Sequence, residues 1–165
     1  MNRLKDKVAV ITGAADGIGL AISKAFASEG AIVIMCDINI TKCIKEAESI
    51  TVNGGIVRTF RCDVGQTKDV QDTVKATIEA FNKIDILVNN AAVAISGDIR
   101  KMPEEDWDMV MNINLKSVYR GIKEVLPHMI KQQTGSIITL SSVQAFRSWD
   151  NWTAYAAAKG AILSM

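Results

Sequence analysis

The segment VAVITGAADGIG, residues 8–19, joins a short apolar run directly to a turn that contains three glycines. The run VAVIT, residues 8–12, is apolar and rich in β-branched side chains, which predicts a buried strand. Apolar residues then recur at helical spacing, which predicts a helix from Gly17 to Glu29. The residues expected to face the core on this helix are Ile18, Ala21, Ile22, Ala25 and Phe26. The glycines therefore occupy a strand-to-helix turn.

Each glycine of this turn has a separate predicted task. Gly13 permits a tight turn, Gly17 lets the backbone approach a pyrophosphate, and Gly19 lets the helix pack closely against the strand. The free N–H groups and positive dipole end of the helix favour phosphate. The turn therefore predicts a dinucleotide site, with Asp16 and Ile18 among its residues. A turn that only reverses the chain is the alternative, because glycine spacing by itself is weak evidence.

Asp37 ends a second apolar run, residues 31–37, that also predicts a strand. A carboxylate at this place accepts hydrogen bonds from both hydroxyls of an adenosine ribose and repels a 2′-phosphate. Asp16 adds to that repulsion if it lies near the same ribose, and neither position carries Arg or Lys. NAD is therefore favoured over NADP as the cofactor. A turn carboxylate without a ligand is the alternative for Asp37.

Strands and helices alternate along the rest of the chain. This order predicts an α/β fold, a Rossmann-type doubly wound parallel sheet in three α/β/α layers, formed by residues 1–165 as a single NAD(P)-binding domain. Thr67 is expected to cap the helix that follows it. The predicted strands are residues 8–12, 31–37, 56–64, 86–90 and 136–142, and the predicted helices are residues 17–29, 41–52, 67–81, 103–131 and 153 onward.

Composition excludes several classes of function. The formal net charge is +1 with no basic patch, which argues against nucleic acid as a partner. No apolar stretch reaches membrane-spanning length, and the apolar run near the N-terminus is too short for a secretory signal, so a cytoplasmic location is expected. Cys36, Cys43 and Cys62 form no CxxC pair and are expected as free thiols. With a single histidine, no metal site is predicted.

Further motifs follow in order: CDV at 62–64, NNAA at 89–92, Ser142, and YAAAK at 155–159. With TGAADGIG at 12–19, they resemble the shorter branch of the short-chain dehydrogenase/reductase family. The resemblance implies NAD(P)-dependent hydride transfer between a secondary alcohol and a ketone. It also implies that Asp63 and Val64 contact adenine, that Asn90 lies by the cofactor ribose, and that Asn114, Ser142, Tyr155 and Lys159 form the catalytic set. Ala92 replaces the family's usual glycine, which puts the geometry of that loop in doubt.

The chemistry explains why a Tyr and a Lys stand four residues apart. They share one face of a helix, and the lysine charge favours the phenolate form of the tyrosine. Tyr155 then serves as general base in oxidation and general acid in reduction, while Lys159 holds the nicotinamide ribose. Ser142 donates to the substrate oxygen, and Asn114 holds a water that links Lys159 to solvent. Each assignment has an alternative. Tyr155 and Lys159 could be a surface pair, Ser142 a cap at the end of its strand, and Asn114 a buried asparagine that only holds its helix in place.

The substrate pocket is expected beyond the strand ends, and its aromatic residues suggest an apolar wall for a ring or a lipid-like secondary alcohol. Core or subunit packing is the alternative for each Trp. The candidate residues are Val93, Ala94, Ser96, Gln144, Phe146, Trp149 and Trp152.

The resemblance also implies that the family's last two strands and substrate loop are absent from these residues. We therefore expect residues 1–165 to be part of a longer polypeptide, which forms a homodimer or homotetramer through its long helices. A truncated, catalytically weak fragment that binds a dinucleotide or a partner is the alternative function.

Overall fold

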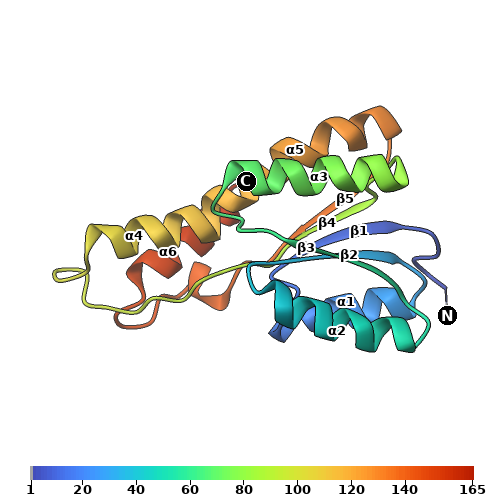
Figure 1. The fold of residues 1–165 in the computed structure, drawn as a ribbon. Coiled ribbons are helices and arrows are strands. Elements are labelled where there is room, and N and C mark those ends of the chain that lie inside the picture. The colour runs from blue at the N-terminus through green and yellow to red at the C-terminus, as the bar shows by residue number, and fades with distance from the viewer. Residues whose placement is uncertain (1) are drawn as a thin grey trace.

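The computed structural model describes residues 2–165, which form a five-stranded parallel sheet with the strand order β3-β2-β1-β4-β5 (Figure 1). Every neighbouring pair of strands is parallel, so the predicted doubly wound α/β sheet is confirmed. The strands are β1 (Val8–Thr12), β2 (Ile32–Asp37), β3 (Ile56–Arg61), β4 (Ile86–Asn89) and β5 (Ser136–Thr139).

Helices cover both faces of the sheet and complete the three layers (Figure 1). On one face lie α1 (Gly17–Ser28) and α2 (Ile40–Val52), and on the other lie α3 (Thr67–Phe81) and α5 (Ser117–Gln132). Side chains of β1 alternate between the two cores: Ala9 and Ile11 pack toward α1 and α2, whereas Val8 and Val10 pack toward α3 and α5. None of the helices in residues 2–165 is long and apolar enough to cross a membrane.

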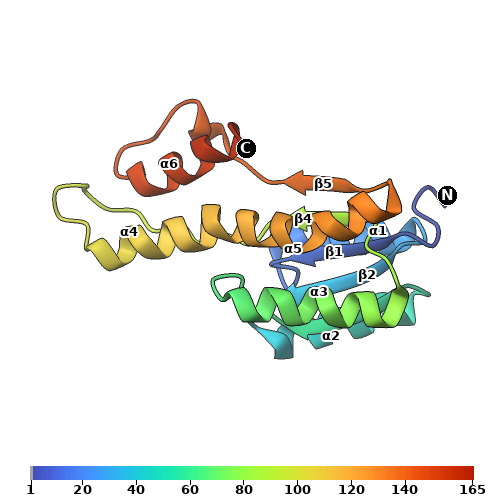
Figure 2. The ribbon, with the colours of Figure 1, turned by 90° about the horizontal axis from the view of Figure 1, so that it is seen from above.

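The remaining helices lie beyond the carboxyl ends of the strands. Figure 2 shows α4 (Glu104–Met111) continuing toward α5 as one long rod, with α3 alongside α5. α6 (Thr153–Ile162) packs against α4 through a small core formed by Val110, Ala154 and Ala158. This packing fixes the helix that carries Tyr155 and Lys159.

The predicted inner face of α1 is confirmed only in part: Ile22 and Phe26 are half-buried and pack against the core, whereas the placement of Ile18, Ala21 and Ala25 is wrong. Ile18 is 65% exposed, and Ala21 and Ala25 are also exposed, whereas Gly19, Ser23 and Ala27 are the buried residues of this helix. Small residues four positions apart let α1 approach the sheet closely. The buried Ser23 hydroxyl has a hydrogen-bond partner, because it donates to the Gly19 carbonyl at 2.8 Å. Small residues therefore take the fully buried positions of this helix, while the larger Ile22 and Phe26 are half-buried against the core.

The long helix predicted for residues 103–131 is interrupted. A π turn spans Asn112–Lys116 between α4 and α5, at the position of Asn114. The sequence pattern carries no sign of this turn, because a π turn inserts one residue without breaking the apolar spacing on either side. Such turns occur frequently at functional sites.

Thr67 does not cap α3, contrary to prediction. Gln66 takes the N-cap position and makes no side-chain cap bond, while the Thr67 hydroxyl accepts a hydrogen bond from Arg120 Nε at 3.1 Å. Two strands are also shorter than predicted: β3 ends at Arg61 and β5 ends at Thr139. Asp63 and Ser142 consequently lie in the segments that follow these strands, at the rim of the sheet.

Asp85, directly before β4, is a buried carboxylate that joins β1 to β4. It accepts the Val8 N–H at 2.9 Å and lies 3.1 Å from the ammonium nitrogens of both Lys7 and Lys83. Burial disfavours the charged carboxylate, but the Val8 N–H and the two ammonium groups outweigh it and lower the pKa of Asp85 below 3.8. The carboxylate therefore stabilises the fold in its charged form.

Gly19→Ala tests the close packing of α1. An added Cβ would lie 2.1 Å from the Gly13 carbonyl oxygen, so the turn must shift, and we expect urea unfolding to show a loss of about 1–3 kcal/mol. Gly160→Ala is the matched control, because its Cβ would meet only the Ala145 oxygen at 3.7 Å and a helical Gly→Ala change gains up to about 1 kcal/mol. Equal stability of the two variants would contradict this packing.

Asp85→Asn tests the buried carboxylate. We expect a loss of about 1–3 kcal/mol of unfolding free energy at pH 7, because the amide keeps the size of the side chain but loses its charge. Since the folded pKa is lowered, the stabilisation is complete above the unfolded pKa and disappears as the pH falls. The difference from wild type should therefore shrink below about pH 4. Asp98→Asn is the control: the Asp98 carboxylate pairs with the exposed Arg100, so its loss should change the free energy of unfolding much less. A difference between wild type and Asp85→Asn that stays constant from pH 7 to pH 3 would contradict the role of the buried carboxylate.

Candidate active site

The glycine turn and the end of β4 are held together by backbone and side-chain hydrogen bonds. Gly13 has a φ of +64° and Gly17 a φ of +51°, a region that favours glycine. The Asn90 amide donates to the Thr12 and Gly13 carbonyls at 2.9 and 3.1 Å, and the Thr12 hydroxyl accepts the N–H groups of Asn90 and Ala91. Asn90, expected beside the cofactor ribose, thus also braces the turn predicted to hold the pyrophosphate.

A cavity of about 190 Å³ opens beside this turn. It brings together four residues assigned to the cofactor from the sequence, although they follow three different strands. These four are Gly13, Asp37, Asp63 and Val64, and the rest of the lining is Ile38, Cys62, Ala91, Ala92, Val93 and Ile113. Ile38 and Ile113 were not anticipated, and the 60% exposure of Ile38 is what an apolar wall for a flat ring requires.

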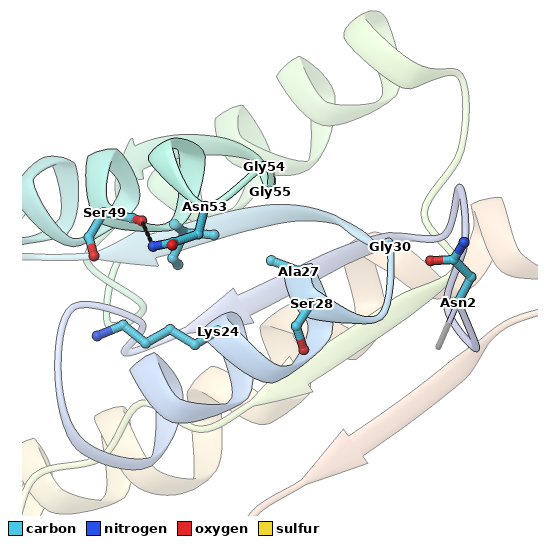
Figure 3. Close-up of a pocket in the computed structure, with 10 residues that line it drawn as sticks. Asn2, Lys24, Ala27, Ser28, Gly30, Ser49, Asn53, Gly54 and Gly55 are labelled. Atoms are coloured by element: carbon cyan, nitrogen blue, oxygen red, sulfur yellow. Dashed lines mark hydrogen bonds between the residues drawn. The ribbon is translucent and has the colours of Figure 1, made fainter.

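The largest cavity, about 510 Å³, lies elsewhere (Figure 3). It lies between the carboxyl ends of α1 and α2, at the opposite end of the sheet from the glycine turn. Lys24 and Ser28 of α1 and Ser49 and Asn53 at the end of α2 line it, and the Asn53 amide donates to the Ser49 carbonyl at 2.7 Å. None of the predicted site residues borders this cavity.

Asp37 lines the cavity of about 190 Å³, Asp16 lies in the glycine turn, and both carboxylates make defined contacts. The two carboxylate oxygens of Asp37 accept the N–H groups of Ala15 and Asn39, each at 2.9 Å. Asp16 accepts the Gly17 N–H at 2.8 Å and pairs with Lys42, and the hydrogen bond from Lys42 is the main cause of the lowered pKa of Asp16. Sequence reasoning missed Lys42, which lies far from Asp16 in the chain.

Arg120, a second residue missed from the sequence, lies beneath the same cavity. It is 6% exposed and donates to the carbonyls of Val64 and Asn112, to the Asn112 side chain at 2.7 Å, and to Thr67. None of these hydrogen-bond acceptors is a carboxylate. Its guanidinium therefore connects the segment predicted to contact adenine to the π turn, and a lone helical Arg gives no sequence signal of such a role.

Asn114 is 1% exposed within the π turn, and its side chain is hydrogen-bonded. Its Oδ1 accepts the Val93 N–H and its Nδ2 donates to the Val93 carbonyl, both at 2.8 Å. The side chain therefore ties α5 to the loop after β4. These contacts match the alternative of a structural asparagine, and they use one of the two N–H donors of its Nδ2.

Lys159 and Tyr155 project from α6 toward the end of β5. The Lys159 ammonium is 5.8 Å from the centroid of the Tyr155 ring and donates to the Leu140 carbonyl at 2.6 Å. Lys159 is 4% exposed, and this burial lowers the pKa of its ammonium. The Ser141 hydroxyl donates to the Lys159 carbonyl at 2.8 Å, so α6 is fastened to the segment that contains Ser142.

Ser142 has an extended backbone and precedes a 3₁₀ turn, Val143–Ala145. Its hydroxyl oxygen accepts the Gln144 N–H at 3.2 Å, which matches the cap given as the alternative, and its proton stays available for another acceptor. The hydroxyl is therefore oriented by the backbone of the turn that follows it.

The candidate substrate residues divide into two groups. Trp152 packs edge-on against the Tyr155 ring, with the ring centroids 5.7 Å apart, and Gln144 is buried. Phe146 and Trp149 are 81% and 59% exposed, and Ala94 and Ser96 also lie at the surface, while Val93 is half-buried. Among the described residues, these aromatics therefore form no closed apolar wall.

None of the three cysteines has a lowered pKa, and Cys62 is the one that lines the cavity of about 190 Å³. All three are free and buried, and burial raises the pKa of Cys36, Cys43 and Cys62, that of Cys43 to about 11. Residues 2–165 contain no group of three His, Cys, Asp or Glu side chains placed to hold a metal ion.

Comparison with known proteins places this geometry in a family. A family model for short chain dehydrogenase matches residues 7–165. The 3-oxoacyl-[acyl-carrier-protein] reductase FabG of Thermotoga maritima is 41% identical over 166 residues, covering 99% of this chain and 66% of that protein. The (2S)-[(R)-hydroxy(phenyl)methyl]succinyl-CoA dehydrogenase subunit BbsD of Thauera aromatica is 36% identical over 162 residues, covering 98% of this chain and 65% of that protein.

The structure gives the same answer. The crystal structure of a short chain dehydrogenase/reductase from Burkholderia phymatum in complex with NAD matches with a TM-score of 0.95 at 32% identity, covering 99% of this chain and 59% of that one. The chain thus spans less than two thirds of the length of each of these relatives. Since the family model matches all but the first residues and the two sequence relatives match almost the whole chain, the protein belongs to the short-chain dehydrogenase/reductase family of oxidoreductases.

Proposed function

We propose that this chain is the cofactor-binding and catalytic part of an NAD-dependent oxidoreductase that interconverts a secondary alcohol and a ketone, with Tyr155 as general acid and base. The observation that carries the proposal is the buried ammonium of Lys159 beside the Tyr155 ring, on a helix fastened to the segment of Ser142. One relative is named a reductase of a 3-oxoacyl group and another a dehydrogenase, which are the two directions of such a reaction. The activity proposed is that of the whole protein, of which this chain spans about two thirds of the relatives' length.

The residues around the glycine turn suit a dinucleotide. Gly13 and Gly19 leave no room for a side chain, Gly17 is open, and the cavity beside them is lined by Asp37, Asp63 and Val64. We assign the pyrophosphate to the turn and the start of α1, adenine to the segment at Asp63, and the nicotinamide ribose to Asn90 and Lys159. The bound nicotinamide supplies the acceptor for the hydride.

The protein's own groups handle the proton. In oxidation the Tyr155 phenolate takes the proton of the substrate hydroxyl, and the nearby Lys159 charge stabilises the phenolate. Ser142 donates its hydroxyl proton to the substrate oxygen, because its own oxygen is already engaged by the Gln144 N–H. Asn114 positions the loop at Val93 through its side chain, and the relay water that links Lys159 to solvent is assigned to this residue.

Two features support NAD over NADP. The carboxylate of Asp37 lines the adenosine cavity, that of Asp16 caps the start of α1 in the glycine turn, and both would repel a 2′-phosphate placed near them. Lys42 is the cation that would attract one, but its ammonium is paired with Asp16 at 2.5 Å. Asp16 thus removes the charge that would otherwise favour NADP.

Exposed apolar residues on the α4–α5 rod support the expected homodimer or homotetramer. Met109, Tyr119, Leu126 and Ile130 are 40–66% exposed along this rod. Exposed apolar side chains that gather in one patch mark interaction surfaces. A second copy of the rod is the partner expected from the sequence.

Tyr155→Phe tests the general acid–base role. We expect kcat for a secondary alcohol with NAD to fall by about 10²–10⁴-fold while NADH binding, followed by fluorescence, stays within a few-fold of wild type. Tyr119→Phe is the matched control, because Tyr119 is the only other tyrosine and lies half-exposed on α5. Wild-type turnover by Tyr155→Phe would remove Tyr155 from its role, and NADH binding without any turnover in wild type would favour the fragment alternative.

Asp16→Asn tests the choice of cofactor. The amide keeps an acceptor for the Gly17 N–H but releases Lys42, so the ratio of NADPH to NADH affinity should rise by about tenfold. The double variant with Lys42→Met should lose that gain, because no cation remains for the 2′-phosphate. A gain of equal size in the double variant would show that Lys42 is not the group involved.

A further inference from the structure

Within residues 2–165, Arg120 is a buried cation that bonds to no carboxylate. It is 6% exposed, and its hydrogen bonds end on two main-chain carbonyls, one hydroxyl and one side-chain amide oxygen. Burying a charge is costly, and buried charges in proteins are usually paired with an opposite one. A sequence that keeps such a group against this cost is expected to use it at a functional site.

Arg120 and Asn112 together hold the segment that follows β3. Arg120 donates to the Val64 carbonyl at 3.2 Å and to the Asn112 side-chain oxygen at 2.7 Å. The Asn112 Nδ2 in turn donates to the Gly65 carbonyl at 3.4 Å. The segment also packs tightly on the π turn, because a Cβ on Gly65 would lie 2.8 Å from Ile113 Cδ1 and 2.9 Å from Asn112 Nδ2. Two consecutive carbonyls are thus fixed by side chains of the π turn and α5.

The segment held in this way carries the groups expected to meet adenine. Asp63 and Val64 both line the cavity of about 190 Å³. One carboxylate oxygen of Asp63 accepts the Gly65 N–H at 2.8 Å, whereas its other oxygen and the Val64 N–H have no hydrogen-bond partner among residues 2–165. An acceptor next to a donor matches the 6-amino group and N1 of adenine. Hypoxanthine, with a 6-oxo group and an N1–H, reverses both.

Arg120 also fixes the spacing between two parts of the cavity lining. One nitrogen of its guanidinium donates to the Val64 carbonyl at 3.2 Å and to the Asn112 carbonyl at 3.3 Å. Val64 lines the cavity, and so does Ile113, the residue that follows Asn112 in the π turn. A binding site discriminates between similar ligands only when supporting residues hold its polar groups in place.

We propose that Arg120 is a positioning residue for the adenine ring and sets the preference of the site for adenine over hypoxanthine. Arg120 acts through the Val64 carbonyl and the Asn112 side chain. These contacts keep the acceptor of Asp63 and the donor of Val64 at a fixed spacing. Without the guanidinium the two groups shift, and the matching base loses its advantage. This inference rests on the proposed function, because it requires a dinucleotide in this cavity.

The test measures the equilibrium binding of two dinucleotides that differ only in the base. Dihydronicotinamide fluorescence gives Kd for NADH and for reduced nicotinamide hypoxanthine dinucleotide, in wild type, Arg120→Met and Asn112→Ala. We expect wild type to bind NADH at least about tenfold more tightly, because hypoxanthine leaves both polar groups unpaired. In both variants the ratio of the two dissociation constants should fall to within about threefold of one. If Arg120→Met does not fold, the ratio for Asn112→Ala decides.

Asp85→Asn is the matched control for a loss of stability. Asp85 is buried like Arg120, but it lies directly before β4, at the opposite end of the sheet from the cavity. Its melting temperature should fall while its ratio of dissociation constants equals that of wild type. A wild-type ratio near one, an unchanged ratio in the Arg120 and Asn112 variants, or an equal fall in Asp85→Asn overturns the inference.

Failure of the proposed function gives a different result. If wild type binds neither dinucleotide, the proposed cofactor site fails, and the inference fails with it. If wild type and the variants show the expected ratios but wild type oxidises no secondary alcohol, the proposed reaction fails while the positioning role of Arg120 is supported.

Discussion

The site depends on the contact between Gly19 and the Gly13 carbonyl, where helix α1 meets the end of β1. A Cβ on Gly19 would lie 2.1 Å from that oxygen and 2.6 Å from the Asn90 amide, so three segments meet where no side chain fits. The closeness brings the start of α1 next to Gly13, which lines the cavity. The small buried face of α1, formed by Gly19, Ser23 and Ala27, continues the same constraint along the helix.

Much of the fold was predictable because it rests on local patterns. The apolar run Val8–Thr12, the glycines after it and the alternation of strands and helices are sufficient to predict a doubly wound parallel sheet. The same reasoning placed Gly13, Asp37 and Asp63 together, because the carboxyl ends of parallel strands meet at one edge, and these residues do line one cavity. Their roles toward a cofactor remain predictions.

What the sequence did not reveal consists of contacts between distant segments. The Lys42–Asp16 pair and the four bonds of Arg120 join residues that are separate in the chain, and no periodic pattern marks them. The inner face of α1 was predicted only in part, because apolar periodicity assumes that large side chains face the core, whereas close helix–sheet approach favours Gly19, Ser23 and Ala27 there. The π turn at Asn114 escaped detection because a single inserted residue preserves the pattern on both sides.

The three buried thiols provide built-in reporters of local opening. Cys43 belongs to the core beneath α1 and α2, whereas Cys36 and Cys62 belong to the core beneath α3 and α5. Since only an exposed thiolate reacts with an alkylating reagent, each cysteine is protected until its own layer separates from the sheet. The alkylation rate of each cysteine would therefore report how often its own helical layer opens, separately for the two layers and without any engineered probe.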